Sequence, residues 1–373
     1  MTKTIRWICE KCDKKWIHPV EKCLYCNGDI KKQIGTNLKV IGVTKVHAPS
    51  PLHPIVPYNI LMLGDENGNR MPKKTIKDYN VEDSYEDKAD SSENTVAVVK
   101  IKYDFYEAVK EALELMGDVE VNENTKILIK PNLAIPGYSY IGICTNPRVL
   151  AGLIQYLIEK GAKKENITIA EQSFFVPLEK IAKKSGIDNV IKKFGVNYVD
   201  ISKTEFEEKQ EREFTFEVSK IVNDFDLILN VPVIKTDMIV GIDGAFENLT
   251  RFLSKKTFDE LAKDPKKAVS ALTLLPKIFP KFITIGDASI GMQGNGPGMN
   301  GVPGFYNLIF AARNPVVHDK AVQEVFCLRK LPYVELAGKL GFGDISNINF
   351  TGNELESLRR DIKQPIGSKL IKN

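Results

Sequence analysis

The sequence predicts an α/β protein whose larger part is a mostly parallel sheet with helices on both faces, preceded by a small β-rich module. Three observations support this prediction. Strand-like and helix-like segments alternate after residue 94, the strand-like segments are apolar on both faces, and four cysteines gather before residue 27. Parallel neighbours are normally joined by a helix, and strands that are covered on both faces are apolar throughout.

The expected elements of the large part follow one another from residue 95 onward. A strand at 95–101 precedes an amphipathic helix at 105–117 and a strand at 126–132. Asn146 and Pro147 are an N-cap and a first-turn proline, and they start a helix that stops at Gly161. The remaining strands are expected at 166–171, 197–201, 226–231 and 281–287, and a late helix is expected at 315–326.

The N-terminal cysteines form two C-x-x-C pairs that are separated by ten residues. Each pair can grip an ion from a tight turn, and four thiolates match a closed tetrahedral zinc site. We therefore expect a structural zinc ion that folds a module too small for its own core, although a rubredoxin-like iron site uses the same ligands. The predicted ligands are Cys9, Cys12, Cys23 and Cys26, whereas Cys144 and Cys327 are isolated.

Charge and hydropathy limit the location and the partners. Residues 1–77 hold 14 Lys and Arg against 6 Asp and Glu, so the basic charge lies at the N-terminal end. Such a patch can attract nucleic acid, an anionic ligand or an acidic protein. No run reaches the roughly 18 apolar residues of a membrane helix, and the N-terminus lacks the apolar core of a signal peptide. We expect a cytoplasmic protein without a membrane partner.

Beyond the four cysteines, the N-terminal part has a Thr44-x-x-His47-Ala48-Pro49 segment and a Pro57-Tyr58 pair. On these residues, the chain over about residues 5–90 resembles the zinc-ribbon and OB-fold proteins of domain-of-unknown-function family 35. Members of that family accompany thiolase-like and other acyl-CoA enzymes, so the resemblance implies such a partner. It also implies a zinc ribbon at 1–35 and a short OB-like β segment at 36–79. Residues 80–94, with six acids and one lysine, are expected to form an acidic linker.

Six blocks of the large part occur in a fixed order, among them ILIKPNL, DLILNVPVIKTD, GIDGAFENLTRFL and ITIGDASIGMQGNGPGMNGVPG. Through these blocks the chain resembles domain-of-unknown-function family 362 over about residues 94–352, and an α/β domain of that type is expected at 95–373. Many relatives have a ferredoxin-like set of cysteines that this segment lacks, so no iron-sulfur cluster is expected in it. Where the family usually has Lys-Thr-His, this chain has Lys235-Thr236-Asp237, and Glu247-Asn248 replaces a common Lys-Asn pair.

Polar residues at strand ends are the candidate site of the large domain. The carboxyl ends of parallel strands share one edge of a sheet, where ligands bind in open α/β folds. The lysines there can bind phosphate or carboxylate, and the amides can orient a ligand. The acids can serve as a general base or hold a divalent cation. The non-functional alternative is that these polar residues simply lie in solvated turns at the strand ends. The candidates are Lys130, Asn132, Lys235, Asp237, Asp243, Glu247, Asn248 and Asp287.

Seven glycines occur within residues 286–304, directly after an expected strand. A loop of this kind can present successive backbone N–H groups to an anion, or it can form a mobile lid. A plain flexible connection is the alternative. The spacing fits neither a dinucleotide fingerprint nor a P-loop. The glycines proposed to contact a ligand are Gly291, Gly294, Gly296 and Gly298.

Several other residues have a structural interpretation that is favoured over a functional one. Cys144 stands beside a helix N-terminus, where a thiol pKa is lowered, but a small core residue is the preferred interpretation. His318 is expected to be a histidine on the surface of its helix. The aromatic side chains that could wall a pocket, and that core packing explains equally well, are Phe174, Phe175, Phe305 and Tyr306.

Three functions remain open on these grounds. In the favoured one, the α/β domain binds an anionic small molecule that bears a phosphate, a carboxylate or a CoA thioester. The domain could also transform this molecule, and the N-terminal module would dock a partner enzyme. The second is a non-catalytic scaffold or accessory subunit of an acyl-CoA enzyme complex. The third is nucleic-acid binding through the basic N-terminal segment, which is disfavoured because no basic-aromatic platform accompanies it. Whether the chain is an enzyme is left open.

Overall fold

The structure is a computed structural model that describes residues 4–48, 58–75, 78–85, 93–133, 135–296 and 301–366. The chain divides into two compact units, Met1–Lys88 and Ala89–Asn373. Residues 86–92 of the expected acidic linker, and Pro49 and Pro57 of the N-terminal motifs, lie outside the described residues. Among the helices that are described, none is long and apolar enough to cross a membrane.

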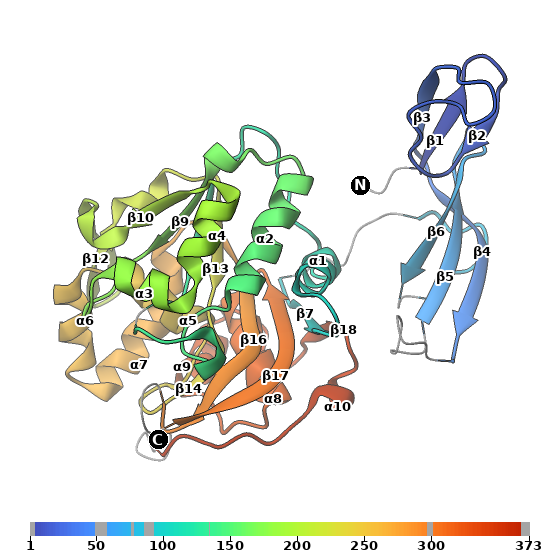
Figure 1. The fold of residues 1–373 in the computed structure, drawn as a ribbon. Coiled ribbons are helices and arrows are strands. Elements are labelled where there is room, and N and C mark those ends of the chain that lie inside the picture. Colours follow the sequence, from blue (N-terminus) through green and yellow to red (C-terminus); the bar gives the residue numbers. More distant parts are fainter. Residues whose placement is uncertain are drawn as a thin grey trace. The chain divides into compact units, whose positions relative to one another are not determined.

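The N-terminal unit begins with a three-stranded antiparallel sheet (Figure 1). Its order is β2-β1-β3, with β1 at Thr4–Cys9, β2 at Lys15–Trp16 and β3 at Ile30–Gly35. The apolar core of this sheet is small, and it consists of the buried side chains of Cys9, Trp16 and Cys23. So few buried groups supply only a small part of the stability that a sheet of this size requires.

A second antiparallel sheet follows in the same unit. It is a meander of β4 (Lys39–Val46), β5 (Tyr58–Gly64) and β6 (Arg70–Thr75). One face packs into a core formed by Leu38, Val40, Leu61, Leu63 and Tyr85. The segment expected to be OB-like therefore contributes three strands in the part that is described, whereas an OB barrel has five.

An eight-stranded sheet forms the centre of the C-terminal unit (Figure 1). Its order is β10-β9-β8-β13-β16-β17-β7-β18. The strands from β10 to β16 run parallel, β17 is antiparallel to both β16 and β7, and β18 is parallel to β7. The predicted, mostly parallel sheet is confirmed. Its strands are β7 (Thr95–Lys100), β8 (Ile127–Pro131), β9 (Ile167–Glu171), β10 (Asn197–Asp200), β13 (Leu227–Val231), β16 (Phe282–Gly294), β17 (Gly301–Ala312) and β18 (Asn349–Gly352).

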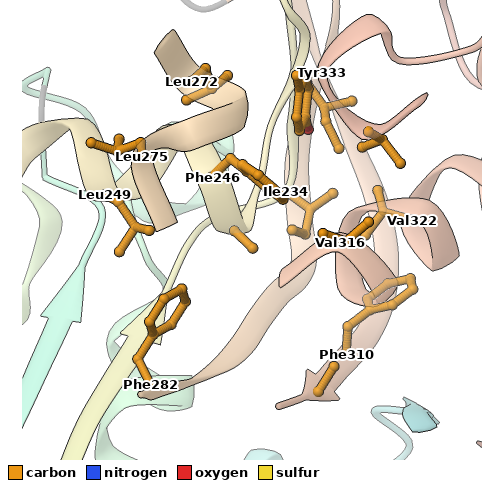
Figure 2. Close-up of a cluster of buried hydrophobic side chains, with 14 of the residues drawn as sticks. Ile234, Phe246, Leu249, Leu272, Leu275, Phe282, Phe310, Val316, Val322 and Tyr333 are labelled. Atoms are coloured by element: carbon orange, nitrogen blue, oxygen red, sulfur yellow. The ribbon is translucent and has the colours of Figure 1, made fainter. Parts of the chain in front are cut away.

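Helices cover both faces of this sheet, because alternate side chains of each strand point to opposite faces. Ile127 and Ile129 of β8 pack under α1 (Phe105–Leu115), α2 (Pro147–Glu159), α3 (Leu178–Ser185) and α4 (Ile187–Phe194). Leu128 belongs to the cluster on the other face. That cluster, part of which Figure 2 shows, lies under α5 (Ala245–Asn248), α7 (Pro265–Leu274), α8 (Pro315–Val325) and α9 (Pro332–Lys339).

Shorter elements complete the C-terminal unit. The expected N-cap is present, since the side chain of Asn146 accepts a hydrogen bond from the backbone N–H of Arg148 at the start of α2. The hairpin of β14 (Lys235–Asp237) and β15 (Gly241–Asp243) follows β13 as a separate two-stranded sheet. The others are β11 (Phe206–Glu211), β12 (Phe214–Ser219), α6 (Lys255–Ala262), α10 (Leu355–Leu358) and the 3-10 helices η1 (Ser139–Ile141), η2 (Lys164–Asn166), η3 (Ile201–Lys203), η4 (Lys220–Asn223), η5 (Leu249–Phe252) and η6 (Leu275–Ile278).

The glycine-rich segment is mainly strand, so the expectation of a loop or lid was wrong for most of it. β16 continues through Gly294 and β17 begins at Gly301, and the two pair as one long antiparallel hairpin. The glycines allow a close approach: a Cβ atom at Gly291 would lie 1.9 Å from the backbone oxygen of Ile234. Gly298 lies outside the described residues.

His318 is buried, which corrects the expectation of a surface histidine. Helix α8 is covered on nearly all sides, and His318 and its neighbour Asp319 are both fully buried. The His318 Nδ1 atom lies 2.8 Å from an Asp319 carboxylate oxygen, whereas Nε2 has no partner among the described residues. A Cβ atom at Gly286 of β16 would lie 2.4 Å from this Nε2. The absence of a side chain at residue 286 therefore makes room for the imidazole.

This close approach predicts coupling between residues 286 and 318. Gly286→Ala should lower the free energy of unfolding by about 1–3 kcal/mol, because overpacking a buried site forces the backbone or the ring to move. In a His318→Ala background the same substitution should cost much less. A double-mutant cycle measured by urea denaturation tests this. Equal costs in the two backgrounds would contradict the steric explanation.

Candidate functional site

The four N-terminal cysteines form one compact group of sulfur atoms. The Sγ atoms of all four lie within 4.8 Å of one another. Three of the pairs, Cys9 with Cys26, Cys12 with Cys23 and Cys12 with Cys26, are 3.5 Å apart. In a tetrahedral thiolate site with metal–sulfur bonds of about 2.3 Å, the sulfurs are about 3.8 Å apart. The observed spacing therefore fits a single metal ion.

Backbone N–H groups support these sulfurs from both turns. The Cys9 Sγ accepts hydrogen bonds from the N–H groups of Lys11 and Cys12 at 3.3 and 3.4 Å. The Cys23 Sγ accepts from Tyr25 and Cys26, both at 3.4 Å. Hydrogen bonds to the charged form favour thiolates, which are the state that binds metal. The two C-x-x-C turns are thus a preformed set of four ligands for a metal ion.

Lys130 lies inside the C-terminal unit, where its ammonium group is fully enclosed. It is fully buried in β8, and its Nζ donates to Glu171 Oε2 at 2.8 Å, to the Pro131 backbone oxygen at 2.9 Å and to Asn248 Oδ1 at 3.2 Å. These three acceptors use all three ammonium hydrogens. Burial lowers the pKa of Lys130, an effect that the nearby Glu171 carboxylate opposes. Lys130 therefore bonds only to groups inside the protein, and it has no donor left for a ligand.

Glu171 and Asn248 extend this cluster across the sheet. Glu171, at the end of β9, accepts hydrogen bonds from the backbone N–H groups of Leu133 and Gln172 as well as from Lys130. The amide of Asn248 donates to Asn230 Oδ1 on β13 at 2.8 Å and to the Lys130 backbone oxygen at 3.1 Å. The cluster joins β8, β9, β13 and α5 at the carboxyl edge of the sheet. Sequence reasoning missed Glu171, although its position at a strand's carboxyl end is the signal that selected the other residues.

Lys235 lies at the same edge and keeps one donor that none of the described residues uses. Its Nζ donates to Asp243 Oδ2 at 2.6 Å across the β14-β15 hairpin. With the Asn132 amide oriented so that both its ends have partners, Asn132 Oδ1 accepts from Lys235 at 3.1 Å. Two of three ammonium hydrogens are thereby satisfied. Lys235 is 4% exposed and Asp243 is 4% exposed, so the ion pair is almost dry.

Acidic groups surround Lys235. Asp237 Oδ1 accepts from the backbone N–H groups of Ile239 and Val240 and thus closes the hairpin turn. Burial raises the pKa of Asp237. Burial, with the negative charges of Glu247 and Asp237, also raises the pKa of Asp243 well above its ordinary value, against the opposing charge of Lys235. Glu247 is partly exposed. Both aspartate carboxyl groups therefore keep a proton to a higher pH than an exposed aspartate does.

Asp287 is joined to the same edge through the start of α2. It is fully buried, and its carboxylate accepts from the backbone N–H of Asn146 at 2.7 Å and from the N–H and hydroxyl of Ser289 at 2.9 and 2.6 Å. Burial raises its pKa even though these bonds lower it. Thr145, the residue before Asn146, accepts from the Asn132 N–H and donates to the Val231 oxygen. Asp287 therefore anchors the helix start that borders the site.

The acids of the C-terminal unit do not form a metal-binding group in the described residues. Among all described residues, the four N-terminal cysteines are the one group of at least three His, Cys, Asp or Glu side chains whose ligand atoms are close enough to hold a metal. Asp237, Asp243 and Glu247 do not meet that spacing, so the expected divalent cation has no support from their geometry. A hollow of about 480 Å³ lies elsewhere, beside residues 338–346, and none of the candidate residues lines it.

The remaining candidates are placed in the interior or on the hairpin. Cys144 is buried, as expected for a core residue, and burial raises its pKa to about 12. Gly294 donates its N–H to the backbone oxygen of Lys363, and a Cβ atom at Gly296 would meet the side chain of Met292 at 3.0 Å. These two glycines thus pack against their own chain. Phe305 is 67% exposed on β17 and does not wall a pocket with the buried Tyr306.

The Lys130 and Glu171 pair yields a stability prediction. Lys130→Met should lower the free energy of unfolding by about 3–5 kcal/mol, because it leaves the buried Glu171 carboxylate without its cation. The double variant Lys130→Met with Glu171→Gln should recover most of that loss. Urea denaturation of the two variants and the unmodified protein is the measurement. A double variant as unstable as the single one would show that packing, not the charge, is responsible.

Comparison with known proteins assigns the C-terminal unit to a family. The profile of the domain of unknown function DUF362 matches residues 127–324. The thylakoid-associated protein sll1697 of Synechocystis sp. (strain ATCC 27184 / PCC 6803 / Kazusa) is 24% identical over 215 residues, which are 56% of this chain and 65% of that protein. The chain thus spans less than two thirds of this relative's length.

Two solved structures are similar to parts of the chain. The lactate racemase apoprotein from Thermoanaerobacterium thermosaccharolyticum is 14% identical, with a TM-score of 0.39 over 66% of this chain and 60% of that one. The Ltp2-ChsH2(DUF35) aldolase is 17% identical, with a TM-score of 0.18 over 21% of this chain and 66% of that one. The DUF362 profile covers more than half of the 373 residues, and the chain belongs to the DUF362 family.

Proposed function

We propose that the C-terminal unit binds a small molecule with an anionic group at the carboxyl edge of its parallel strands, next to Lys235. The observation that carries the proposal is the incomplete satisfaction of the Lys235 ammonium. Asp243 and Asn132 accept two of its hydrogens, and the third is available to a ligand. In a nearly dry site one charge-assisted hydrogen bond is stronger than it is in water.

The neighbouring acids make this binding dependent on protons. An anion beside Asp237 and Asp243 is repelled when both are ionised, and burial raises the pKa of each. A proton on one of them removes part of the repulsion. The same Asp243 and Lys235 pair, 2.6 Å apart, suits proton transfer to or from a bound molecule, which is the form of catalysis we propose for this site.

The proposal predicts a ligand response that depends on Lys235. Sugar phosphates, short dicarboxylates and CoA thioesters are titrated into the full chain, and the thermal unfolding midpoint is followed. At least one compound should stabilise the protein, by about 2.7 kcal/mol at a hundred times its Kd. Lys235→Met should lose at least half of that effect. The stabilisation should also grow as the pH is lowered, because the pKa values of Asp237 and Asp243 are raised and protonated acids repel an anion less.

A matched control is Lys163→Met, which removes an exposed lysine paired with Glu123 on the surface. Its response to the ligand should equal that of the unmodified chain. An unchanged response in Lys235→Met, with the variant folded, would remove Lys235 from the site.

For the N-terminal unit we propose a structural zinc ion and a docking role. Thiolate ligands in a tetrahedral set favour zinc, and the core of three side chains is too small to fold without a metal. Ile60 and Met62 of β5 are 38% and 39% exposed on the sheet face opposite Leu61. This apolar surface, within a basic unit that resembles acyl-CoA-associated modules, supports docking to an acyl-CoA enzyme.

The zinc assignment predicts one metal ion per chain. Elemental analysis of the purified protein should find zinc, and Cys12→Ser should lower its content and unfold the N-terminal unit while the C-terminal unit still unfolds cooperatively. Cys327→Ser, at an exposed cysteine outside the cluster, is the control and should retain the metal. Iron in place of zinc, seen as visible thiolate-to-iron absorption, would contradict the assignment.

A further inference from the structure

Arg251 is a buried cation for which the described residues supply no counter-ion. It lies in η5, directly after the α5 residues Glu247 and Asn248, and it is 7% exposed. Its Nε and Nη1 atoms have no hydrogen-bond partner in the part of the chain that the structure describes. Among the described residues, none of the ion pairs involves Arg251. Sequence reasoning did not select this residue.

Such an arrangement is costly unless something binds there. A guanidinium keeps its proton under all ordinary conditions, so it cannot lower the cost by becoming neutral. Burying an unpaired charge costs several kcal/mol, and native proteins normally pair such groups. The nearby charge of Lys130 has the same sign. Burial is the main cause that lowers the pKa of Lys130, Glu171 opposes it, and the positive charge of Arg251 lowers this pKa further. None of the described residues therefore supplies the anion that would balance the charge of Arg251.

Two aromatic rings fix the guanidinium in place. Its central carbon lies 4.6 Å from the centre of the Phe174 ring and 4.3 Å from that of Phe258. The rings also contact each other, with their centres 5.0 Å apart. Stacking on aromatic faces holds the planar group in one orientation and keeps water from its faces, while the Nε and Nη1 atoms stay buried without a partner among the described residues.

The end of β9 sets the position of this arginine. Gln172, the residue after Glu171, donates its Nε2 hydrogens to the backbone oxygens of Arg251 and Leu253, each at 2.6 Å. Glu171 itself binds Lys130, whose Nζ also reaches Asn248. Arg251 thus belongs to the same carboxyl edge as the candidate site, on the side of β9.

We propose that Arg251 is a second anion-binding residue of this edge, and that it takes a carboxylate or phosphate group through the N–H atoms that no described residue pairs, with Phe174 and Phe258 as the apolar wall. This inference rests on the proposed function, to which it adds the chemical class of the ligand group and a second point of attachment. A carboxylate and a phosphate share the geometry that a guanidinium recognises with two parallel hydrogen bonds.

The test uses simple anions on the full chain. Inorganic phosphate and acetate are titrated separately, with chloride added to keep the ionic strength constant, and the unfolding midpoint is recorded. At saturating phosphate or acetate the midpoint should rise by about 2–4 °C or more. Arg251→Met should remove that rise and, without added anion, should be at least as stable as the unmodified protein, since it removes an unpaired buried charge.

Two further variants show whether a loss of the anion response is due to Arg251, to a general change of charge or to Lys235. Lys256→Met, at a lysine whose side chain is 71% exposed in the same region, should keep the full response. Lys235→Met should also keep its response to the inorganic anion, because Arg251 is intact. Loss of the response in Lys235→Met with retention in Arg251→Met would overturn the arginine and leave the proposed function standing. Loss in Arg251→Met with retention in Lys235→Met is the expected pattern and would support the anion site at Arg251, while the role of Lys235 is decided by the separate titration with organic ligands.

A second measurement avoids the question of whether the variant folds. Crystals of the unmodified chain are soaked in sodium selenate, and the anomalous signal locates the anion. A peak within hydrogen-bond distance of the Arg251 guanidinium is expected. A water molecule at that position, together with an unchanged unfolding midpoint in phosphate and acetate, would show that solvent alone satisfies the arginine and would overturn the proposal.

Discussion

The buried Lys130 and Glu171 ion pair is the interaction on which the ligand-facing edge of the C-terminal unit depends. Glu171 holds the residues after β8 and β9 through the N–H groups of Leu133 and Gln172, and Lys130 holds α5 through Asn248. Both ions have lost their hydration, so neither can leave the cluster without a large cost. The same contacts place Gln172, and through it Arg251, at the edge. One ion pair thus fixes the frame around the candidate site.

Most carboxylates at this edge act on the protein itself. Asp287 binds the N–H of Asn146 at the start of α2, and Asp319 binds the N–H groups of Ala245 and Phe246 at the start of α5. An internal carboxylate thus takes the position that an anionic ligand could occupy at each helix start. Lys235 and Arg251 differ from these groups, because each retains hydrogen-bond donors that no described residue uses.

The elements that sequence could predict are those with a local signal. The C-x-x-C pairs, the Asn146 and Pro147 helix start and the apolar strands depend on residues close in the chain, and the structure has all of them. The partners of Lys130 lie 41 and 118 residues away, and no spacing rule connects them. Counting glycines suggested a loop, whereas the pairing of β16 with β17 made a hairpin. Arg251 stands out only through a missing partner, which three-dimensional structure alone can show.

The place of β7 bears on how the chain is made. This first strand of the large sheet lies between β17 and β18, and about 200 residues separate Lys100 from Gly301, where β17 begins. On a ribosome that adds roughly 5–20 residues per second, β7 waits about 10–40 seconds for its neighbours. Its five fully or nearly fully covered residues, Thr95 to Val99, are apolar or small and are exposed to solvent meanwhile. During synthesis there is therefore an interval in which this apolar nascent segment is unpaired and is a binding site for a chaperone.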